Sequence, residues 1–315
     1  MSSRTVRIVF MGTPVFAVPS LSALAEGHEV VAVVTQPDKP RGRGLDTVPS
    51  PVKELATSNG IPVLEPAKLR DEQFLRQLKD LAPEVIVVVA YGKILPKSVL
   101  TLPPMGCVNL HASVLPKYRG AAPINRAIIN GEMETGNCTM LMDEGMDTGG
   151  VLLCEKEPIS EEDTAEDLFK RLSAKGAHLL RVTIERLIEG SITPVPQDSS
   201  KATYAPMLRK EDGRIDWRKG ALEIKNHLRG LYPWPGAFTT WEKGTLKVHR
   251  GRVAQAESVS GAAHGTVVGL TREGILVECG SGVFEITELQ PENKKRMSAV
   301  DFIKGYRLKV GERFA

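Results

Sequence analysis

Long apolar runs are missing from this 315-residue chain. No stretch approaches the ~18 consecutive apolar residues that a membrane-spanning helix needs. The N-terminus enters a strand-like run at Val6 without the small-residue cleavage site of a signal peptide. We therefore expect a cytoplasmic protein with no membrane partner.

Cysteine is also scarce, with Cys107, Cys138, Cys154 and Cys279 widely spaced and no Cys-x-x-Cys pair among them. This pattern predicts neither a disulfide framework nor a zinc site, and it fits a reducing compartment. Cys107 could be a nucleophile, but a small buried strand residue explains it better.

A dinucleotide fingerprint is absent too. Gly12-Thr13-Pro14 follows the first strand-like run but lacks the G-x-G-x-x-G spacing, so it predicts a tight strand-to-helix turn rather than NAD binding. The histidines and acidic residues do not cluster at metal-ligand spacings, and we expect no bound metal.

Net charge is only +3, but its distribution is uneven. Residues 1–200 carry a balance of −4, and residues 201–315 carry +7. A basic second part attracts polyanions, nucleic acid above all, although modest positive charge also aids solubility.

What the chain does have is an alternation of strand-like and helix-like segments through its first 190 residues. Glu84–Ala90 is apolar without alternation, which is typical of a central parallel strand covered on both faces. Ser50 and Pro51 form an N-cap and first turn, and Thr164–Glu189 reads as a long amphipathic helix. The fold class is α/β: a Rossmann-like, doubly wound, mostly parallel sheet domain over residues 1–190.

The remainder changes character. Residues 191–208 contain closely spaced prolines among polar residues and are expected to form a linker. Residues 209–315 then show a helix near 218–230 and five short strand-like runs between 237 and 289. This spacing predicts a small β-barrel, with an OB-fold as the leading candidate.

Three polar side chains could perform chemistry at the carboxyl edge of the predicted parallel sheet. Asn109 and His111 stand two residues apart at the end of a strand, so they share one face. Asp147 lies in a loop tightened by nearby glycines, where a carboxylate can approach an imidazole. An amide N–H can stabilise an oxyanion, and an imidazole beside a carboxylate can exchange a proton near neutral pH. The combination suits acyl transfer.

Several motifs together resemble the folate-dependent formyltransferases. The shared features are Asn109-x-His111, the stretch Ser113–Gly120 and Asp147-Thr148-Gly149. Gly12-Thr-Pro, Thr35–Gly44, Gly120–Ile124, Arg214–Trp217 and Pro233-Trp-Pro235 extend the likeness to the branch of that family that formylates methionyl-tRNA. The resemblance covers nearly the whole chain.

The resemblance implies transfer of a formyl group from 10-formyltetrahydrofolate to the α-amino group of methionyl-initiator tRNA. Asn109 and protonated His111 would stabilise the tetrahedral intermediate, and Asp147 would orient His111 and assist proton transfer. The folate would be bound by Tyr91 and by the stretch Ser113, Val114, Leu115 and Pro116.

The acceptor tRNA would be held by basic residues in both parts of the chain. The loop Thr35–Val48 carries Lys39, Arg41 and Arg43 among glycines and prolines, and the family points to Arg43 as its main tRNA contact. In the second part, Lys247 and Arg250 belong to a larger set of basic residues that would hold the tRNA backbone.

Three alternative functions compete with this interpretation. The site could formylate another amine, such as a sugar nucleotide or glycinamide ribonucleotide, or it could hydrolyse formyl-folate. A non-catalytic RNA-binding protein built on an OB-fold is a third possibility, but it leaves Asn109, His111 and Asp147 unexplained. Nothing in the sequence demands more than a monomer.

Overall fold

The computed structural model describes residues 4–41 and 46–315. Within these residues the chain forms two compact units. Unit 1 comprises the residues up to Pro123, together with Glu134–Pro158 and Phe169–Pro206. Unit 2 comprises Ile124–Met133, Ile159–Leu168 and Met207–Ala315.

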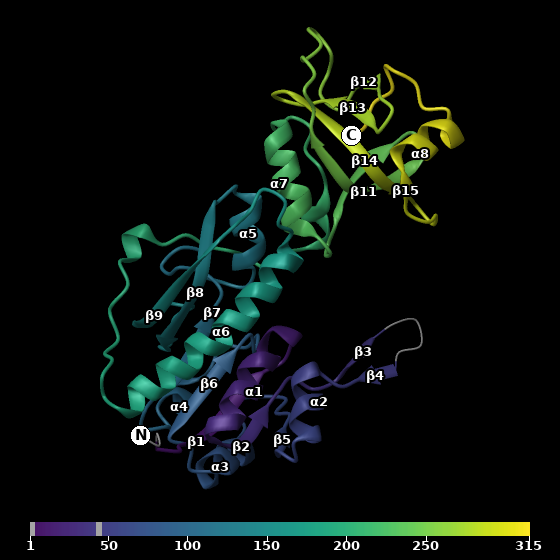
Figure 1. Cartoon of the computed structure of the whole chain (residues 1–315). Helices are drawn as coiled ribbons and strands as arrows, with labels where there is room; N and C mark the ends of the chain where they lie inside the picture. Colours follow the sequence, from purple (N-terminus) through teal and green to yellow (C-terminus); the bar gives the residue numbers. More distant parts are fainter. Residues whose placement is uncertain (1–3, 42–45) are drawn as a thin grey trace. The chain divides into compact units, whose positions relative to one another are not determined.

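Unit 1 is built on a seven-stranded sheet with the strand order β5-β2-β1-β6-β7-β8-β9 (Figure 1). The strands are β1 (Arg7–Gly12), β2 (Glu29–Val34), β5 (Val63–Leu64), β6 (Val85–Val89), β7 (Cys107–His111), β8 (Glu134–Leu141) and β9 (Val151–Pro158). Strands β5, β2, β1, β6 and β7 run parallel to one another, and β8 and β9 are antiparallel to their neighbours. The predicted mostly parallel α/β sheet is therefore confirmed.

Helices flank this sheet in sequence order: η1 (Val15–Ala17), α1 (Val18–Gly27), α2 (Pro51–Ser58), α3 (Glu72–Asp80), α4 (Lys97–Leu100) and α6 (Ala165–Ile188). Side chains of α3 and α4 pack with alternate residues of β1 and β6 in one apolar cluster. On β8, Asn137 donates to the Leu172 carbonyl and the Thr139 hydroxyl bonds that of Thr183, so α6 is held against this strand. Ser50 caps α2 as predicted, since its hydroxyl accepts the Lys53 N–H at 3.1 Å.

Strands β6 and β7 owe their central position to their composition. All five residues of each strand are buried. The run of β6 is apolar throughout, which is typical of a strand covered on both faces, whereas β7 also buries the polar side chains of Asn109 and His111. Val88 pairs with Asn109 and Val89 with Leu110, so the ends of β6 and β7 lie level. The carboxyl edge of the sheet is thereby fixed where His111 ends β7.

Two segments expected to be loops have more structure than the sequence suggests. Lys39–Arg41 (β3) pairs antiparallel with Asp46–Val48 (β4) within the predicted basic loop. Residues 191–206 belong to unit 1, and Val195 pairs with Val151 through hydrogen bonds of 2.8 Å in both directions. The segment expected as a linker thus runs along the first sheet.

Unit 2 contains a six-stranded, all-antiparallel sheet, which confirms a separate β-domain in the second half of the chain. Its elements are α7 (Ala221–Leu231), β10 (Ala237–Trp241), β11 (Gly244–Val253), β12 (Val267–Leu270), β13 (Ile275–Glu278), β14 (Val283–Pro291), β15 (Met297–Ser298) and α8 (Ala299–Tyr306), after the short η3 (Lys210–Gly213). The two edge strands are both bonded to the end of the chain: Ala315 pairs with Thr240 next to β10, and Phe314 donates to Gly265 beside β12. These last residues close the sheet on itself.

Helix α5 (Pro123–Ile129) packs against α7 within unit 2. The Asn125 side chain donates to the Gly230 carbonyl at 2.7 Å, and a Cβ on Gly230 would lie 2.5 Å from the Ile129 side chain. Any residue larger than glycine at position 230 would push the two helices apart.

Candidate functional site

The candidate site lies at the carboxyl edge of the sheet in unit 1. Asn109 and His111 project from the same face of β7, and both are buried, with relative exposures of 8% and 6%. A strand buried on both faces positions polar side chains firmly, because its backbone is bonded on either side. The two residues are therefore held in a fixed spacing.

Asp147 comes from the loop between β8 and β9, and the structure places its carboxylate beside His111. The Asp147 Oδ2 atom lies 3.7 Å from His111 Nδ1. The same oxygen accepts the Gly120 N–H at 2.7 Å. Asp147 has a left-handed backbone with φ of 54°, a conformation that aspartate tolerates better than most residues. The predicted His–Asp juxtaposition is present in this geometry.

The His111 ring has its other nitrogen engaged. Nε2 lies 2.9 Å from the Tyr118 carbonyl oxygen, and because a carbonyl only accepts, Nε2 must carry the hydrogen. The Nδ1 atom is the one that faces Asp147. At 3.7 Å this approach is longer than a hydrogen bond, which leaves Nδ1 available to a reacting oxygen.

The Asn109 carboxamide makes no hydrogen bond to any other residue in the part of the chain that the structure describes. A buried amide without a protein partner is costly unless a ligand satisfies it. Its N–H groups are therefore free to donate to a substrate oxygen on the His111 face of β7.

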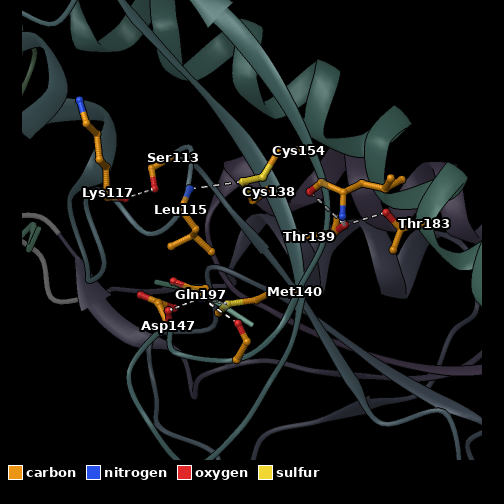
Figure 2. Close-up of a disulfide and its surroundings, with 12 residues drawn as sticks. Ser113, Leu115, Lys117, Cys138, Thr139, Met140, Asp147, Cys154, Thr183 and Gln197 are labelled. Carbon is orange, nitrogen blue, oxygen red and sulfur yellow. Dashed lines mark hydrogen bonds between the residues drawn. A yellow bond between two sulfur atoms is a disulfide. The ribbon is translucent and has the colours of Figure 1, made fainter. Parts of the chain in front are cut away.

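A glutamine that the sequence did not reveal holds the Asp147 loop in place. Gln197 Nε2 donates to the carbonyls of Asp147 and Gly149 at 2.9 and 2.8 Å (Figure 2). Its Oε1 accepts from Arg119 Nε and Nη2 at 3.1 and 2.8 Å. Since Arg119 is only 2% exposed, Gln197 also satisfies a buried guanidinium. No local pattern marks Gln197, because it lies fifty residues beyond the carboxylate that it positions.

The stretch Ser113–Pro116 follows directly on His111. The Ser113 hydroxyl donates to the Lys117 carbonyl at 2.6 Å, and the Leu115 N–H donates to Cys138 Sγ at 3.4 Å (Figure 2). Leu115 packs with Cys138, Met140 and Val151 in a small apolar cluster. The stretch is thus a well-anchored wall beside the site.

Tyr91 is placed differently from the other candidate folate residues. Its ring belongs to the apolar cluster shared with α3 and α4 and is 1% exposed. Burial raises the pKa of its hydroxyl to about 12, and that hydroxyl has no hydrogen-bond partner among the described residues. Only its backbone carbonyl, which accepts Gln36 Nε2 at 2.7 Å, takes part in the loop above β6.

The candidate tRNA-binding residues lie in both units. Arg43 falls outside the described residues, and Lys39 and Arg41 are placed only by the backbone of β3. Lys247 and Arg250 are exposed on β11, where Arg250 approaches Glu288 at 3.6 Å. Other basic side chains of unit 2 have carboxylate partners, as Arg252 does with Glu285. The positive charge of unit 2 is therefore partly neutralised within the fold.

The structure corrects one expectation about cysteine. Cys138 and Cys154 form a disulfide, whereas Cys107 and Cys279 are free and buried. The antiparallel register of β8 and β9 places Cys138 directly opposite Cys154. Their separation in sequence gave no sign of this pairing, because it depends on where the intervening loop turns the chain.

No group of three or more histidine, cysteine, aspartate or glutamate side chains within 4–41 and 46–315 is arranged to hold a metal ion. In the same ranges, none of the helices has the length and apolar character needed to cross a membrane.

Comparison with known families matches both parts of the chain. Residues 6–184 match the model described as "Formyl transferase", and residues 207–307 match "Formyl transferase, C-terminal domain". The chain is 52% identical over 306 residues to a methionyl-tRNA formyltransferase from Citrifermentans bemidjiense, covering 97% of this chain and 95% of that one. A protein of the same name from Myxococcus xanthus is 51% identical over 305 residues, covering 97% and 96%.

Solved structures share the fold at lower identity. WlaRD, a sugar 3N-formyl transferase, superposes with a TM-score of 0.67 at 20% identity over 93% of this chain and all of its own. HypX from Aquifex aeolicus in complex with tetrahydrofolic acid has a TM-score of 0.62 at 16% identity, covering 98% of this chain and 49% of that protein.

Proposed function

Because the chain belongs to the formyl transferase family, we propose how its own residues carry out the formyl transfer. The reaction moves a formyl group from 10-formyltetrahydrofolate to the α-amino group of methionyl-initiator tRNA. Relatives about half identical over nearly the full length are named for this activity. The observation that carries the residue assignment is the approach of Asp147 to His111 beside the unpartnered amide of Asn109.

The nucleophile needs little help to become neutral. An α-amino group has a pKa of about 7.7–8.0, so a useful fraction is unprotonated near pH 7. Attack on the formyl carbon places negative charge on the formyl oxygen. Positioning and oxyanion stabilisation are therefore the main tasks of the site.

Asn109 and His111 supply the donors for that oxyanion. The Asn109 amide N–H and the His111 Nδ1–H converge from one face of β7, and protonation of His111 places a hydrogen on Nδ1 while Nε2 stays bonded to Tyr118. Buried donors act in a low-dielectric setting and need no reorganisation when the charge develops.

Asp147 stabilises the charged imidazole and helps to move the proton. Its Oδ2 atom is fixed by the Gly120 N–H and faces His111. The attacking nitrogen must lose a proton and the departing folate nitrogen must gain one. The carboxylate assists this exchange through water.

The formyl donor lies along Ser113–Pro116, which leads away from His111 and is anchored by the hydrogen bonds of Ser113 and Leu115. Ser113 and Val114 supply backbone polar groups, while Leu115 and Pro116 supply apolar surface. For Tyr91 the buried ring favours a contribution through the backbone of its loop.

The tRNA is held by the loop Thr35–Val48 through Lys39, Arg41 and Arg43, with Arg43 as the principal contact, and by Lys247 and Arg250 on unit 2. Phosphate contacts of this kind give affinity, whereas contacts to splayed bases give selectivity. We also propose that the protein works in the cytoplasm and that the monomer is the active form.

The test is formyl transfer from labelled 10-formyltetrahydrofolate to methionyl-tRNA by His111→Ala and Asp147→Ala. Loss of oxyanion or proton-transfer groups typically lowers kcat by about 10²–10³-fold, and we expect both substrates still to bind. His178→Ala is the matched control, since His178 is exposed on α6. Near-normal turnover in either site variant would refute the assignment.

A further inference from the structure

The disulfide between Cys138 and Cys154 lies directly against the site. In the register of the sheet, Cys138 stands opposite Cys154 on β9 and opposite His111 on β7. Figure 2 shows that its sulfur also faces the Leu115 amide, which donates to it at 3.4 Å. The Cys138 sulfur is therefore bonded covalently to Cys154 and also contacts the stretch Ser113–Pro116, along which the formyl donor is proposed to lie.

The two bonded cysteine residues differ in their exposure to solvent. Cys138 has a relative exposure of 0%, whereas Cys154 is exposed on β9, the last strand of the sheet order. A small thiol in solution can therefore reach Cys154 but cannot reach Cys138. This asymmetry determines which sulfur is attacked first.

The remaining cysteines do not compete for this chemistry. Both Cys107 and Cys279 are buried, and desolvation raises the pKa of each thiol to about 12. Because the thiolate is the reactive form, these two residues stay inert near neutral pH.

The Leu115 region is well placed to respond to the state of Cys138. Leu115 is 7% exposed and packs against Cys138 and Met140. Close beside it, a Cβ on Gly136 would lie 2.9 Å from the Val114 side chain. With so little free space, a displaced or rotated sulfur must be accommodated by the stretch Ser113–Pro116.

We propose that Cys138 and Cys154 form a reversible thiol–disulfide pair through which the redox state of the cell sets the enzyme's affinity for the formyl donor. The proposal rests on the proposed function, because it requires the donor to lie along Ser113–Pro116. In reducing compartments a protein disulfide is usually transient and regulatory rather than structural.

A low-molecular-weight thiol such as glutathione reduces the disulfide in two exchange steps. A glutathione thiolate attacks Cys154 Sγ, forms a mixed disulfide and releases Cys138 as a thiolate, which takes up a proton. A second glutathione thiolate attacks the glutathione sulfur, releasing the Cys154 thiolate, which is protonated. Two protein thiols and one glutathione disulfide result, and the reverse sequence with glutathione disulfide restores the bond.

Reduction of the disulfide removes the fixed hydrogen-bond acceptor of the Leu115 N–H in the stretch Ser113–Pro116. In the disulfide, the Cys138 sulfur is held in one position and has no hydrogen, so it can only accept from Leu115. As a free thiol it can turn between staggered rotamers and itself carries a hydrogen. The Leu115 amide then no longer has a constant acceptor, while the hydrogen bonds that hold Asp147, from Gly120 and Gln197, do not involve Cys138.

The experiment equilibrates the full-length protein in glutathione buffers from reducing to oxidising. Free thiols are counted after denaturation, and kcat and KM for 10-formyltetrahydrofolate are measured with methionyl-tRNA in excess. We expect two thiols at the oxidising limit and four at the reducing limit. On reduction we expect KM for the donor to rise roughly fivefold, the factor expected for one neutral hydrogen bond, with kcat changing less than twofold.

Two variants separate this effect from other redox chemistry. Cys154→Ser, or Cys154→Ala should the serine variant fold poorly, should show the reduced-state KM in every buffer. Cys279→Ala is the control in unit 2 and should keep the full response.

Each outcome decides between the two proposals. Absence of formyl transfer in both redox states would overturn the proposed function. Transfer with the same KM in both states, a thiol count of four in the most oxidising buffer, or a redox response retained by Cys154→Ser would each overturn the switch and leave the formyl transfer standing.

Discussion

The strongest test of how the site is held together is the substitution Gln197→Ala. Gln197 touches none of the groups proposed to react, yet its side-chain amide bonds the backbone on both sides of Thr148 and the guanidinium of Arg119. Alanine removes all four bonds. The loop that carries Asp147 then keeps its short internal bonds, such as Thr148 to Asp143, and the bond from the Gly120 N–H to the Asp147 carboxylate, but it loses the bonds from Gln197 to its backbone.

The magnitude follows from the partners left behind. Each neutral amide–carbonyl bond contributes about 0.5–1.5 kcal/mol net, and bonds to a charged group contribute about 1.5–3 kcal/mol. Arg119 is 2% exposed, and its remaining side-chain bond is a long one of 3.5 Å to Ser199. Water entering the space of the missing side chain would restore part of the lost hydrogen-bond free energy. We expect the free energy of unfolding to fall by about 2–4 kcal/mol.

The rate of formyl transfer should fall by more than the loss of folded protein accounts for. A displacement of about 1 Å in a positioning group can lower the rate by about 10²-fold. Gln197→Glu separates the two effects. Glutamate keeps acceptors for Arg119 but replaces the donor to Asp147 and Gly149 with an oxygen facing two carbonyls. We expect it to recover much of the stability and little of the activity.

The assays are urea denaturation and labelled formyl transfer, with Gln77→Ala as control because Gln77 is exposed on α3. Formyl transfer by folded Gln197→Glu within threefold of the unsubstituted protein would show that Gln197 does not position Asp147.

Three further substitutions probe other parts of the molecule. Gly120→Ala should lower kcat by about tenfold or more at saturating substrates. Gly120 has φ of 117°, and a Cβ there would lie 2.8 Å from a backbone carbonyl oxygen. The resulting shift of the backbone would displace the N–H that holds Asp147. Glu157→Gln should lower the free energy of unfolding at pH 7 by about 1–3 kcal/mol. Burial alone would raise the pKa of Glu157, but hydrogen bonds from two basic side chains of α6 hold it below its ordinary value, so this stability is present above about pH 4.3 and is lost as the pH falls through the folded-state pKa. Unfolding measured from pH 7 to pH 3 should therefore show the wild-type protein converging on the variant. Lys247→Ala combined with Arg250→Ala should raise KM for methionyl-tRNA and make its dependence on salt shallower. The slope of log KM against log salt concentration should fall by up to about 0.7–0.9 for each phosphate that is no longer bound. An unchanged salt dependence would exclude phosphate binding at both positions.

Local sequence pattern was sufficient for the parts of the site that lie on regular structure. Asn109 and His111 could be placed on one face because a strand has a period of two. The neighbouring strand at Glu84–Ala90 could be placed centrally because its apolar residues do not alternate with polar ones. Similarly, the Ser50–Pro51 pair predicts the start of α2 from hydrogen-bonding groups within one turn.

The parts that could not be predicted depend on contacts distant in sequence. Gln197 bonds residues about fifty and eighty positions earlier, and the polar, proline-rich segment around it has the composition of a linker. The pairing of Cys138 with Cys154 requires the register of β8 on β9, which a bulge between Thr139 and Met140 shifts. Composition and periodicity contain no information about such registers.

The geometry of Asp147 explains why a site of this kind needs these distant supports. One carboxylate oxygen, Oδ2, is committed to the Gly120 N–H and to the face of His111. The other, Oδ1, accepts no hydrogen bond from any residue that the structure describes, so it can receive a proton from water near the attacking amine. A carboxylate with one bound and one free oxygen would swing if its backbone were loose, and its left-handed φ of 54° is not a conformation that the loop would keep unaided. The hydrogen bond from Gln197 to the Asp147 carbonyl supplies the restraint at the backbone, and the Gly120 N–H supplies it at the side chain. The two restraints come from separate segments of unit 1, and removing either should impair proton transfer even though neither donor exchanges a proton itself.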